Sequence, residues 1–233
     1  MQLFYIPEIT GNTVTLDADE SKHAVKVLRL ISGDQIQIVD GKGGFYRAEI
    51  LDAHPKSCSL SILETHKEFE KRDFSLHLAI APTKNIDRFE WSLEKCTEIG
   101  IDTITPLLSA HSERKIIKPE RLEKILVSAM KQSVKAYLPK LNELTRFEDL
   151  VSADFQGEKY IAHCNDGEKP HLQKQVSMGK DVLILIGPEG DFSPEEVEQA
   201  KAAGFTEISL GKARLRTETA GVVACHIVNL ANE

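Results

Sequence analysis

The sequence has 233 residues, of which 41% are hydrophobic and 28% are charged, as is typical of a soluble globular protein with one large domain or two modest ones. No apolar run reaches the roughly 20 residues that cross a bilayer, and MQLFYIPEIT lacks the pattern of a signal peptide, so we expect a cytoplasmic protein without a membrane anchor. The net charge of −7 argues against a nucleic-acid partner unless basic residues gather locally.

The first part of the chain, to about Glu64, is predicted to be mainly β. Strand patterns occur in LFYI, TVTL, QIQIVD, FYRAEIL and CSLSIL, and one helix is expected from Asp19 to about Leu30. This pattern predicts a small β-barrel. The charged segment Thr65–Asp73 lacks apolar periodicity, so we place the boundary there, between domains at 1–68 and 74–233.

From Phe74 onward, strand patterns alternate with helix patterns. The expected strands are SLHLAIA, DTITPLL, KYIAHC, VLILIG and EISL. The expected helices are Ile86–Ile99, Pro119 to about Tyr137, Pro194–Ala203 and Glu218 to about Leu230. Such alternation predicts an α/β domain with a parallel sheet, and ligands of open parallel sheets bind at the carboxyl ends of the strands.

Two segments gather basic residues. In SKHAVKVLRL, the predicted helix carries Lys22, Lys26 and Arg29 on one face, beside His23. The stretch 111–140 holds eight Lys or Arg against three Glu, a local charge of +5 that leaves −12 for the rest of the chain. Each cluster alone is compatible with a solvated helix face, but two of them in an acidic chain favour an anionic partner.

The stretch LILIGPEGDFSPEE passes from a buried strand through a turn into a helix. Gly187 and Gly190 are expected to let the backbone turn sharply and to let a ligand approach the peptide groups. Ser193 and Glu196 have the spacing of a capping box, with Pro194 in the first turn. GPEG alone is a weak signal, because any strand-to-helix turn can carry two glycines.

A second loop, LGKARLRTETA, strengthens that signal. Gly211 ends the preceding strand, and the nine residues from Lys212 to Ala220 are rich in hydrogen-bonding groups. The helix that follows is apolar nearly all round, which predicts burial inside the domain or against another subunit. Polar groups so close to a buried helix must be paired or bind a ligand.

Several other chemistries lack their motifs. The sequence has no GxGxxG, GxxxxGK[ST] or GxSxG, which disfavours a dinucleotide site, a P-loop and a serine nucleophile. Cys58, Cys96, Cys164 and Cys225 show no metal-binding spacing, so we predict reduced, mostly buried thiols, no disulfide and no metal. His163 and Cys164 at a strand end are interpreted as a packed pair rather than a catalytic one.

At the motif level, the chain resembles a known family. IGPEGDFSPEE followed by LGKARLRTETA is similar to the C-terminal signature of the SPOUT-class methyltransferases that methylate N3 of a uridine in 16S ribosomal RNA. HAVKVLRL and QIQIVDGKGGFYRAEI resemble that family's N-terminal PUA-like module, and LEKCTEIGIDTITPLLSAHSERK and SAMKQSVKAYLPKL its middle motifs. Asp191 stands where the family often has a second glycine, and Lys135 where it often has arginine, which loses the bidentate fork of a guanidinium.

This resemblance implies an α/β fold with a C-terminal SPOUT trefoil-knot domain, a mainly parallel sheet and a small N-terminal PUA-like β-barrel. It implies S-adenosyl-L-methionine as cofactor, 16S rRNA or the small ribosomal subunit as partner, and a homodimer whose contact comes largely from the final helix. The cofactor-binding positions it implies are Leu185, Ile186, Gly187, Pro188, Glu189, Gly190, Leu210, Gly211, Leu215, Arg216, Thr217, Thr219 and Ala220.

The same resemblance directs the chemistry to three residues. Arg216 is expected to stabilise negative charge on the uracil carbonyls, although a salt bridge to a neighbouring carboxylate is a rival role. Glu189 or Glu218 is expected to accept the proton from N3, and the choice between them stays open. The expected RNA contacts are Lys22, His23, Lys26, Arg29, Lys84, Arg88, Arg114, Lys115, Gln132 and Lys135.

Two other classes of function are kept beside this interpretation. One is an RNA-binding protein of the same fold without catalysis. The other is a metabolic α/β enzyme that uses the glycine turns for a phosphorylated small molecule. That second alternative leaves the basic β-rich module without a role.

Overall fold

The computed structural model describes residues 2–233, which divide into two compact units. Unit 1 contains the residues through Lys71 together with Val127–Leu138, and unit 2 contains Arg72–Leu126 and Pro139–Glu233. The helix α3, Pro119–Gln132, therefore belongs in part to each unit. No helix among the described residues is both long and apolar enough to span a membrane.

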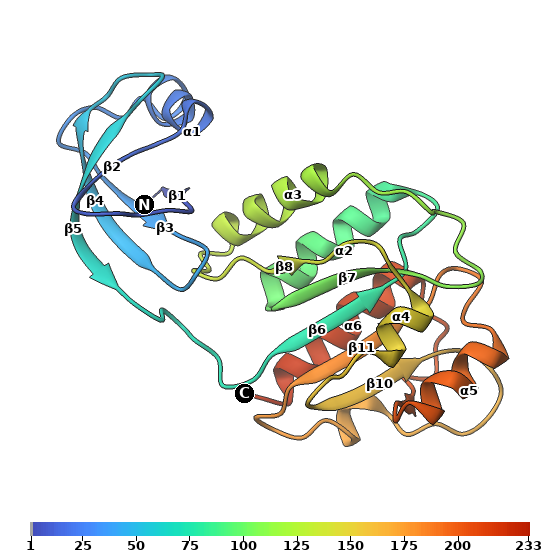
Figure 1. Ribbon diagram of the computed structural model, residues 1–233. Helices are drawn as coiled ribbons and strands as arrows, with labels where there is room; N and C mark the ends of the chain where they lie inside the picture. Colours follow the sequence, from blue (N-terminus) through green and yellow to red (C-terminus); the bar gives the residue numbers. More distant parts are fainter. Residues whose placement is uncertain (1) are drawn as a thin grey trace. The chain divides into compact units, whose positions relative to one another are not determined.

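Unit 1 is built on a curled sheet of five strands (Figure 1). The strands are β1 (Leu3–Tyr5), β2 (Thr13–Thr15), β3 (Gln35–Val39), β4 (Phe45–Asp52) and β5 (Ser59–His66). Their order is β1-β3-β4-β5-β2, with β1 parallel to β3 and all other pairs antiparallel. Phe4, Ile36 and Ile38 are among the residues that fill the core inside the curl, as the alternating strand patterns predict.

The helical segment of unit 1 differs from the expected single α-helix. It consists of α1 (Ala18–Lys22) followed by the π-helix η1 (His23–Val27), in which the Leu28 amide donates to the His23 carbonyl over 3.0 Å. Arg29 lies beyond the helix in a left-handed conformation with φ of 58°. The prediction that Arg29 shares a helical face with Lys22 and Lys26 is therefore wrong, although all three side chains are exposed.

The helix α3 also ends before the expected residue, at Gln132 instead of Tyr137. Val134 takes φ of 57°, and the Lys135 amide donates to the Met130 carbonyl over 3.1 Å, which closes the helix as a C-terminal cap. A glycine normally marks such a cap, and the sequence offers a β-branched residue instead. Beyond the cap, Ala136 packs with Val39 and Phe45 of the unit 1 sheet.

Unit 2 is an α/β layer built on a parallel sheet. Its strands are β6 (Leu76–Ile80), β7 (Thr103–Leu108), β8 (Lys140–Leu141), β9 (Thr145–Arg146), β10 (Glu158–Ala162), β11 (Val182–Ile186) and β12 (Thr206–Ile208). The order is β12-β10-β11-β6-β7-β8, with β9 also paired to β7, and every pair is parallel. The prediction of a parallel sheet is confirmed.

Helices cover both faces of this sheet (Figure 1). They are α2 (Ile86–Ile99), α4 (Phe147–Ser152), the 3₁₀ helix η2 (Leu172–Lys174), α5 (Pro194–Ala202) and α6 (Thr217–Leu230). The helices α2 and α6 pack together, and Gly221 lets α6 approach β6 so closely that a Cβ there would lie 2.7 Å from Ile80. The bounds of α2 match the prediction, because Asn85 caps its start and Gly100 ends it.

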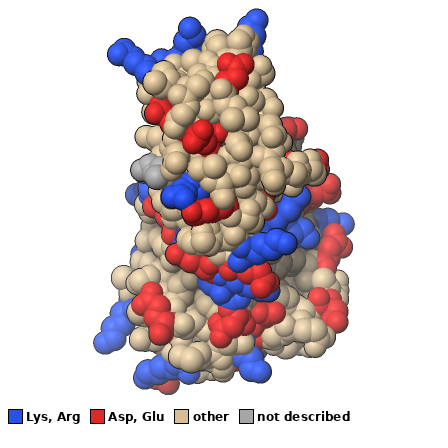
Figure 2. All heavy atoms as spheres, turned by 90° about the vertical axis from the view of Figure 1, so that its left-hand side faces the viewer, with Lys and Arg blue, Asp and Glu red and all other residues tan. Residues whose placement is uncertain are grey.

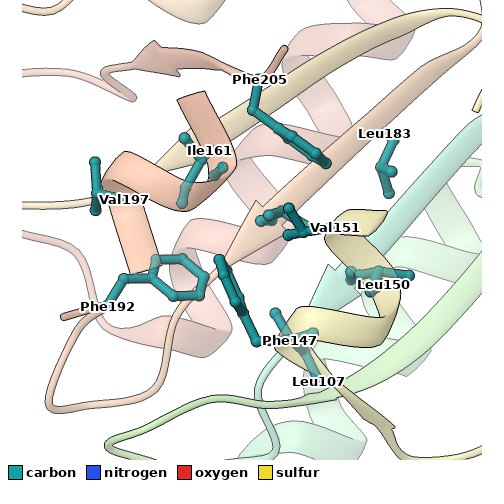
Figure 3. Packing of buried hydrophobic residues seen from close by; sticks show 12 residues of the cluster. Leu107, Phe147, Leu150, Val151, Ile161, Leu183, Phe192, Val197 and Phe205 are labelled. Carbon is teal, nitrogen blue, oxygen red and sulfur yellow. The ribbon is translucent and has the colours of Figure 1, made fainter. Parts of the chain in front are cut away.

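On the opposite face, α4 and α5 cover an apolar cluster (Figure 3). Phe147 of α4 and Phe192, just before α5, meet with ring centroids 5.6 Å apart. Ile161 of β10 and Leu183 of β11 belong to the same cluster. This cluster holds the loop after β11 against the sheet, and it therefore fixes the end of the sheet at which ligands are expected.

Candidate functional site

A cavity of about 860 Å³ lies in unit 2 at the carboxyl ends of β10, β11 and β12. Its size is within the range of small-molecule sites. Three loops form its walls: 162–169 after β10, 186–191 after β11, and 208–217 after β12. Arg88 of α2 and Ala220 of α6 complete the lining. The position agrees with the expectation for an open parallel sheet.

The loop after β11 is held firmly in place, and both of its glycines are closely packed. A Cβ on Gly187 would lie 3.1 Å from the ring of Phe192, and a Cβ on Gly190 would lie 2.9 Å from His111. Neither glycine has a positive φ. Both glycines thus allow close packing, Gly187 against Phe192 and Gly190 against His111. Gly187 also lines the cavity, so its role in letting a ligand approach the backbone stays a prediction, whereas Gly190 does not line the cavity.

The start of α5 shows the predicted capping box. The Ser193 hydroxyl accepts a hydrogen bond from the Glu196 amide at 3.2 Å, and the Glu196 carboxylate accepts one from the Ser193 amide at 2.9 Å. The second carboxylate oxygen of Glu196 accepts from the Ala110 amide at 2.8 Å, which ties the loop after β7 to the same point. Glu196 is buried, and its contacts fix the start of α5 and with it the loop after β11 that forms one wall of the cavity.

The loop after β12 is more open. Gly211 has φ of 130° and free space around it, so a glycine is required there by the backbone conformation alone. Lys212, Arg214 and Arg216 are exposed, and none of the three forms an ion pair with any carboxylate of residues 2–233. The salt bridge considered as the rival role of Arg216 is therefore absent from the described structure. Arg216 is also the N-cap residue of α6.

The two walls are joined directly at the start of α6. The hydroxyl of Thr217 donates to the carbonyl of Gly187 over 3.0 Å, and both residues are buried. The Ala220 amide donates to the Arg216 carbonyl over 2.8 Å in the first turn of the helix. The backbone from Arg216 onward is therefore fixed, whereas the guanidinium of Arg216 is free to reach into the cavity.

The third wall, after β10, was not predicted from the sequence. Cys164 is exposed and lines the cavity, while His163 beside it is buried, so the interpretation of these two as a packed pair is wrong for Cys164. His163 Nε2 contacts the Glu207 carboxylate at 2.9 Å. Burial lowers the pKa of His163, and the positive charge of Lys169 adds to the effect. The imidazole therefore binds a proton less readily than an ordinary histidine does.

Most of the predicted cofactor positions meet at this cavity. Those that line it are Ile186, Gly187, Pro188, Glu189, Leu210, Gly211, Leu215, Arg216, Thr217 and Ala220. Three do not line it: Leu185 lies in the apolar cluster under α5, Gly190 faces His111, and Thr219 lies in the first turn of α6. Apolar residues (Ile186, Leu210 and Leu215) line the cavity together with glycine and polar residues, a mixture that suits a planar ring with hydrogen-bonding edges.

The two candidate proton acceptors are in different surroundings. Glu189 is exposed and lines the cavity, and one of its oxygens accepts from the Lys84 amide at 2.9 Å. Glu218 is buried in α6, does not line the cavity, and lies 4.0 Å from the Arg88 guanidinium. Of the two candidates, only Glu189 therefore lines the cavity.

Charge at the cavity is mainly positive. Its cationic residues are Arg88, Lys169, Lys212, Arg214 and Arg216, and its acidic residues are Asp166, Glu189 and Asp191. Two of the acids are engaged: Glu189 by the Lys84 amide, and Asp191 by two backbone amides. Within residues 2–233, no group of three or more His, Cys, Asp or Glu is arranged to hold a metal ion.

The other expected RNA contacts vary in their availability. In unit 1, Lys22, His23, Lys26, Arg29 and Gln132 are exposed, and Lys135 is partly buried. In unit 2, Arg114 donates to the carbonyls of Thr83 and Lys84 at 3.0 and 2.6 Å, and Lys84 pairs with Glu113 at 2.8 Å. Figure 2 shows Lys and Arg interleaved with Asp and Glu on the face it draws, not gathered in one basic field.

Comparisons with known proteins agree with this geometry. Residues 70–229 match the RNA methyltransferase domain family, and residues 16–63 match the RNA methyltransferase PUA domain family. The ribosomal RNA small subunit methyltransferase E of Synechocystis is 34% identical, over 98% of this chain and 77% of its own length.

Solved structures give the same result. The crystal structure of a probable rRNA-methyltransferase from Porphyromonas gingivalis is 42% identical with a TM-score of 0.93, over 100% of this chain and 98% of that chain. The ribosomal RNA small subunit methyltransferase E of Neisseria gonorrhoeae, bound to S-adenosyl methionine, is 26% identical with a TM-score of 0.87, over the same shares of each chain.

Proposed function

The chain belongs to the ribosomal RNA small subunit methyltransferase E family, and we propose that it methylates N3 of a uridine in 16S ribosomal RNA with S-adenosyl-L-methionine as the donor. The observation that carries this proposal is the cavity of about 860 Å³ at the ends of β10, β11 and β12. It combines apolar walls with free cations, and it contains ten of the residues that the family resemblance assigns to the cofactor.

The charge of the cavity supports an anionic second substrate. S-adenosylmethionine carries a sulfonium and an ammonium against one carboxylate, so its net charge is positive. The positively charged residues that line the cavity do not by themselves favour this positively charged donor, because like charges repel. Lys212, Arg214 and Arg216, which have no described ion-pair partner, are instead suited to the phosphates and developing negative charge of RNA. The donor would then be held mainly by the apolar and backbone walls.

Little covalent chemistry is needed from the protein. The sulfonium supplies the methyl group: its S–CH₃ bond breaks as the bond to N3 forms, and the proton of N3 must leave. We assign that proton to Glu189, because Glu189 lines the cavity whereas Glu218 is buried and does not line it. Arg216 stabilises the negative charge that grows on the uracil carbonyls. The cavity walls hold the donor so that its S–CH₃ bond points at N3 of the uracil.

RNA binding is divided between the units in this proposal. The module at 1–68 supplies Lys22, Lys26 and Arg29, whose charges are exposed, and the domain at 74–233 supplies the rim of the cavity. Lys115 is exposed, whereas Arg114 is bonded to the carbonyls of Thr83 and Lys84. Arg114 therefore has a structural role as well as any contact with RNA.

We also propose a homodimer in which α6 forms part of the contact. The inner side of α6 is buried on the sheet, but its outer side carries Val222, Val223 and Ile227 partly exposed and Leu230 47% exposed. Such an apolar strip on a soluble protein favours association. Sedimentation equilibrium should give a dimer for the wild type and a monomer for Val223→Asp, and a monomeric wild type would contradict the dimer.

The function is tested by methyl transfer to RNA. Purified protein should transfer tritiated methyl groups from S-adenosylmethionine to 16S rRNA, either free or in small subunits, and nuclease mapping with mass spectrometry should place the label on N3 of a uridine. A folded protein that binds this RNA but neither binds the donor nor transfers methyl would instead be a non-catalytic RNA-binding member of the fold.

A further inference from the structure

Asp191 has an unusual backbone and fully engaged polar groups. It lies between β11 and α5 with φ of 63°, a left-handed conformation that residues other than glycine rarely adopt. One carboxylate oxygen accepts from the Phe192 amide at 2.8 Å, and the other accepts from the Cys164 amide at 2.7 Å. Its backbone amide donates to the Pro188 carbonyl over 2.9 Å, and its carbonyl lies 3.0 Å from His111 Nδ1.

The contact with Cys164 joins two walls of the cavity that are 27 residues apart in the chain. Cys164 lies at the start of the loop after β10, just beyond the last strand residue Ala162. At the far end of this loop, the Pro170 carbonyl accepts from the Ser209 amide at 2.9 Å. The third wall is therefore tied at its start to the β11 loop by Asp191 and at its end to the β12 wall by Ser209.

A glycine at 191 would adopt the same backbone without strain, so the aspartate is not explained by the turn. Its carboxylate is explained by the amide that it accepts from another loop. A hydrogen bond from an amide to a carboxylate is shorter and stronger than one between neutral groups, as the 2.7 Å distance illustrates. Aspartate also tolerates the left-handed region better than most residues do. Residue 191 thus combines a strained turn with a fixed loop-to-loop contact.

We propose that Asp191 is a positioning residue that holds the third wall of the donor cavity in its binding conformation through the Cys164 amide. The inference rests on the proposed function, because it concerns the same cavity. The role does not require Asp191 to take a proton, because each of its carboxylate oxygens acts as the acceptor of a backbone amide. Its effect is on how well the cavity is formed before the donor arrives, which changes donor affinity more than the rate at saturating donor.

Three substitutions separate the parts of this role. Asp191→Gly removes the acceptor and relieves the backbone, Asp191→Ala removes the acceptor and keeps the strain, and Asp191→Asn keeps one side-chain oxygen for the Cys164 amide. Glu195→Gln is the control, because it removes an exposed negative charge from the start of α5. We expect the Kd for S-adenosylmethionine to rise about 10-fold in the Gly and Ala variants and less than about 3-fold in the Asn and control variants.

Amide hydrogen exchange provides a measurement that does not depend on the donor or on turnover. In protein without donor, Asp191→Gly should speed exchange across residues 163–169 while the exchange of β10 and β11 stays as in the wild type. Asp191→Gly with wild-type affinity and wild-type exchange would overturn the inference. A wild-type protein that fails to bind the donor would contradict the proposed function instead, and exchange would still test the tie.

Discussion

The two loops that face each other across the cavity are held in opposite ways. In the loop after β11, Phe192 is in the core, Asp191 accepts two amides and Glu196 bonds to both Ser193 and Ala110. In the loop after β12, Lys212 and the residues around it are exposed, and the cations have no described ion-pair partner. One loop provides a fixed wall, whereas the other provides charges that are available to a ligand.

The two loops therefore have different roles: the loop after β11 sets the shape of the cavity, and the loop after β12 supplies its positive charge. A wall that is already fixed loses little conformational freedom when a ligand binds, so more of the contact energy appears as affinity. Cations without an internal partner keep their charge available for phosphate and for the transition state. Apart from Glu189, to which we assign the proton of N3, substitutions in the fixed loop should therefore act on stability and donor affinity, and substitutions in the open loop should act on turnover and RNA binding.

The largest effect on chemistry is expected at Arg216. Arg216→Ala should lower methyl transfer at least about 100-fold, since a preorganised donor of this kind contributes roughly 3 kcal/mol to the transition state. Donor affinity should change by less than about 3-fold. Single-turnover methyl transfer and calorimetry check the two expectations, with Arg146→Ala, an exposed arginine paired with Glu148, as the matched control. Turnover at the wild-type rate would remove Arg216 from the chemistry.

A free-energy change of similar size is expected in the stability of the folded protein when the pH falls, because of a histidine in the parallel sheet. Burial lowers the pKa of His77 in β6 to about 4, and its Nε2 lies 2.7 Å from the Thr105 hydroxyl. Above pH 6.5 this histidine is neutral both folded and unfolded. Between pH 6.5 and 4 the unfolded chain binds a proton that the folded chain does not, so roughly 3 kcal/mol of stability is lost.

Urea unfolding at pH 7 and pH 4.5 measures this loss. His77→Gln keeps a side chain that can bond to Thr105 but has no proton to gain, so its stability should fall less between the two pH values. His163, whose pKa is also lowered, adds to the loss in both proteins. An equal fall in wild type and variant would show that His77 does not carry the effect.

Much of the fixed frame is readable from the sequence, because its signals are local. The bounds of α2 match the predicted range of Ile86–Ile99, and Ser193 with Glu196 starts α5 as their spacing predicts. The parallel sheet follows from the alternation of strands and helices. The predicted end of α3 failed, because Val134 adopts a left-handed conformation that its side chain does not signal.

The residues that line the cavity could be predicted from the sequence only in part. Ten of the expected cofactor positions line the cavity, but its third wall was missed because the loop from His163 to Lys169 has no motif. This loop lies beside the other two walls because β10 pairs between β11 and β12 in the sheet. That strand order is a property of the whole sheet and not of the local sequence. The packing of Gly187 against Phe192 and of Gly190 against His111 was not predicted either, because the sequence does not show which side chains lie against these two glycines.

A moderate effect is expected from the capping box of the fixed loop. Ser193→Ala removes the acceptor for the Glu196 amide and should cost about 1 kcal/mol of stability. Turnover per folded molecule should stay close to that of the wild type, because Ser193 does not line the cavity. Urea midpoints and active-site titration check both. Lost turnover in a variant with unchanged stability would contradict the division between frame and chemistry.

The smallest effect is expected from the outer cations of the open loop. Lys212→Ala with Arg214→Ala should raise the KM for RNA a few-fold and lower the slope of log affinity against log salt by up to about 1.4, as for two lost contacts with single-stranded phosphates. Donor affinity should not change. Lys174→Ala with Lys180→Ala, two exposed lysines outside the cavity, is the matched control. An unchanged salt slope would show that the outer cations do not contact RNA.

The most direct test of the central claim is a crystal structure with S-adenosylmethionine. We expect the donor to lie between residues 186–190 and 210–217, with the loop from Cys164 to Lys169 closing the third side and the methyl group turned toward Arg216. A crystal saturated with donor that shows it bound elsewhere, or not at all, would contradict the account.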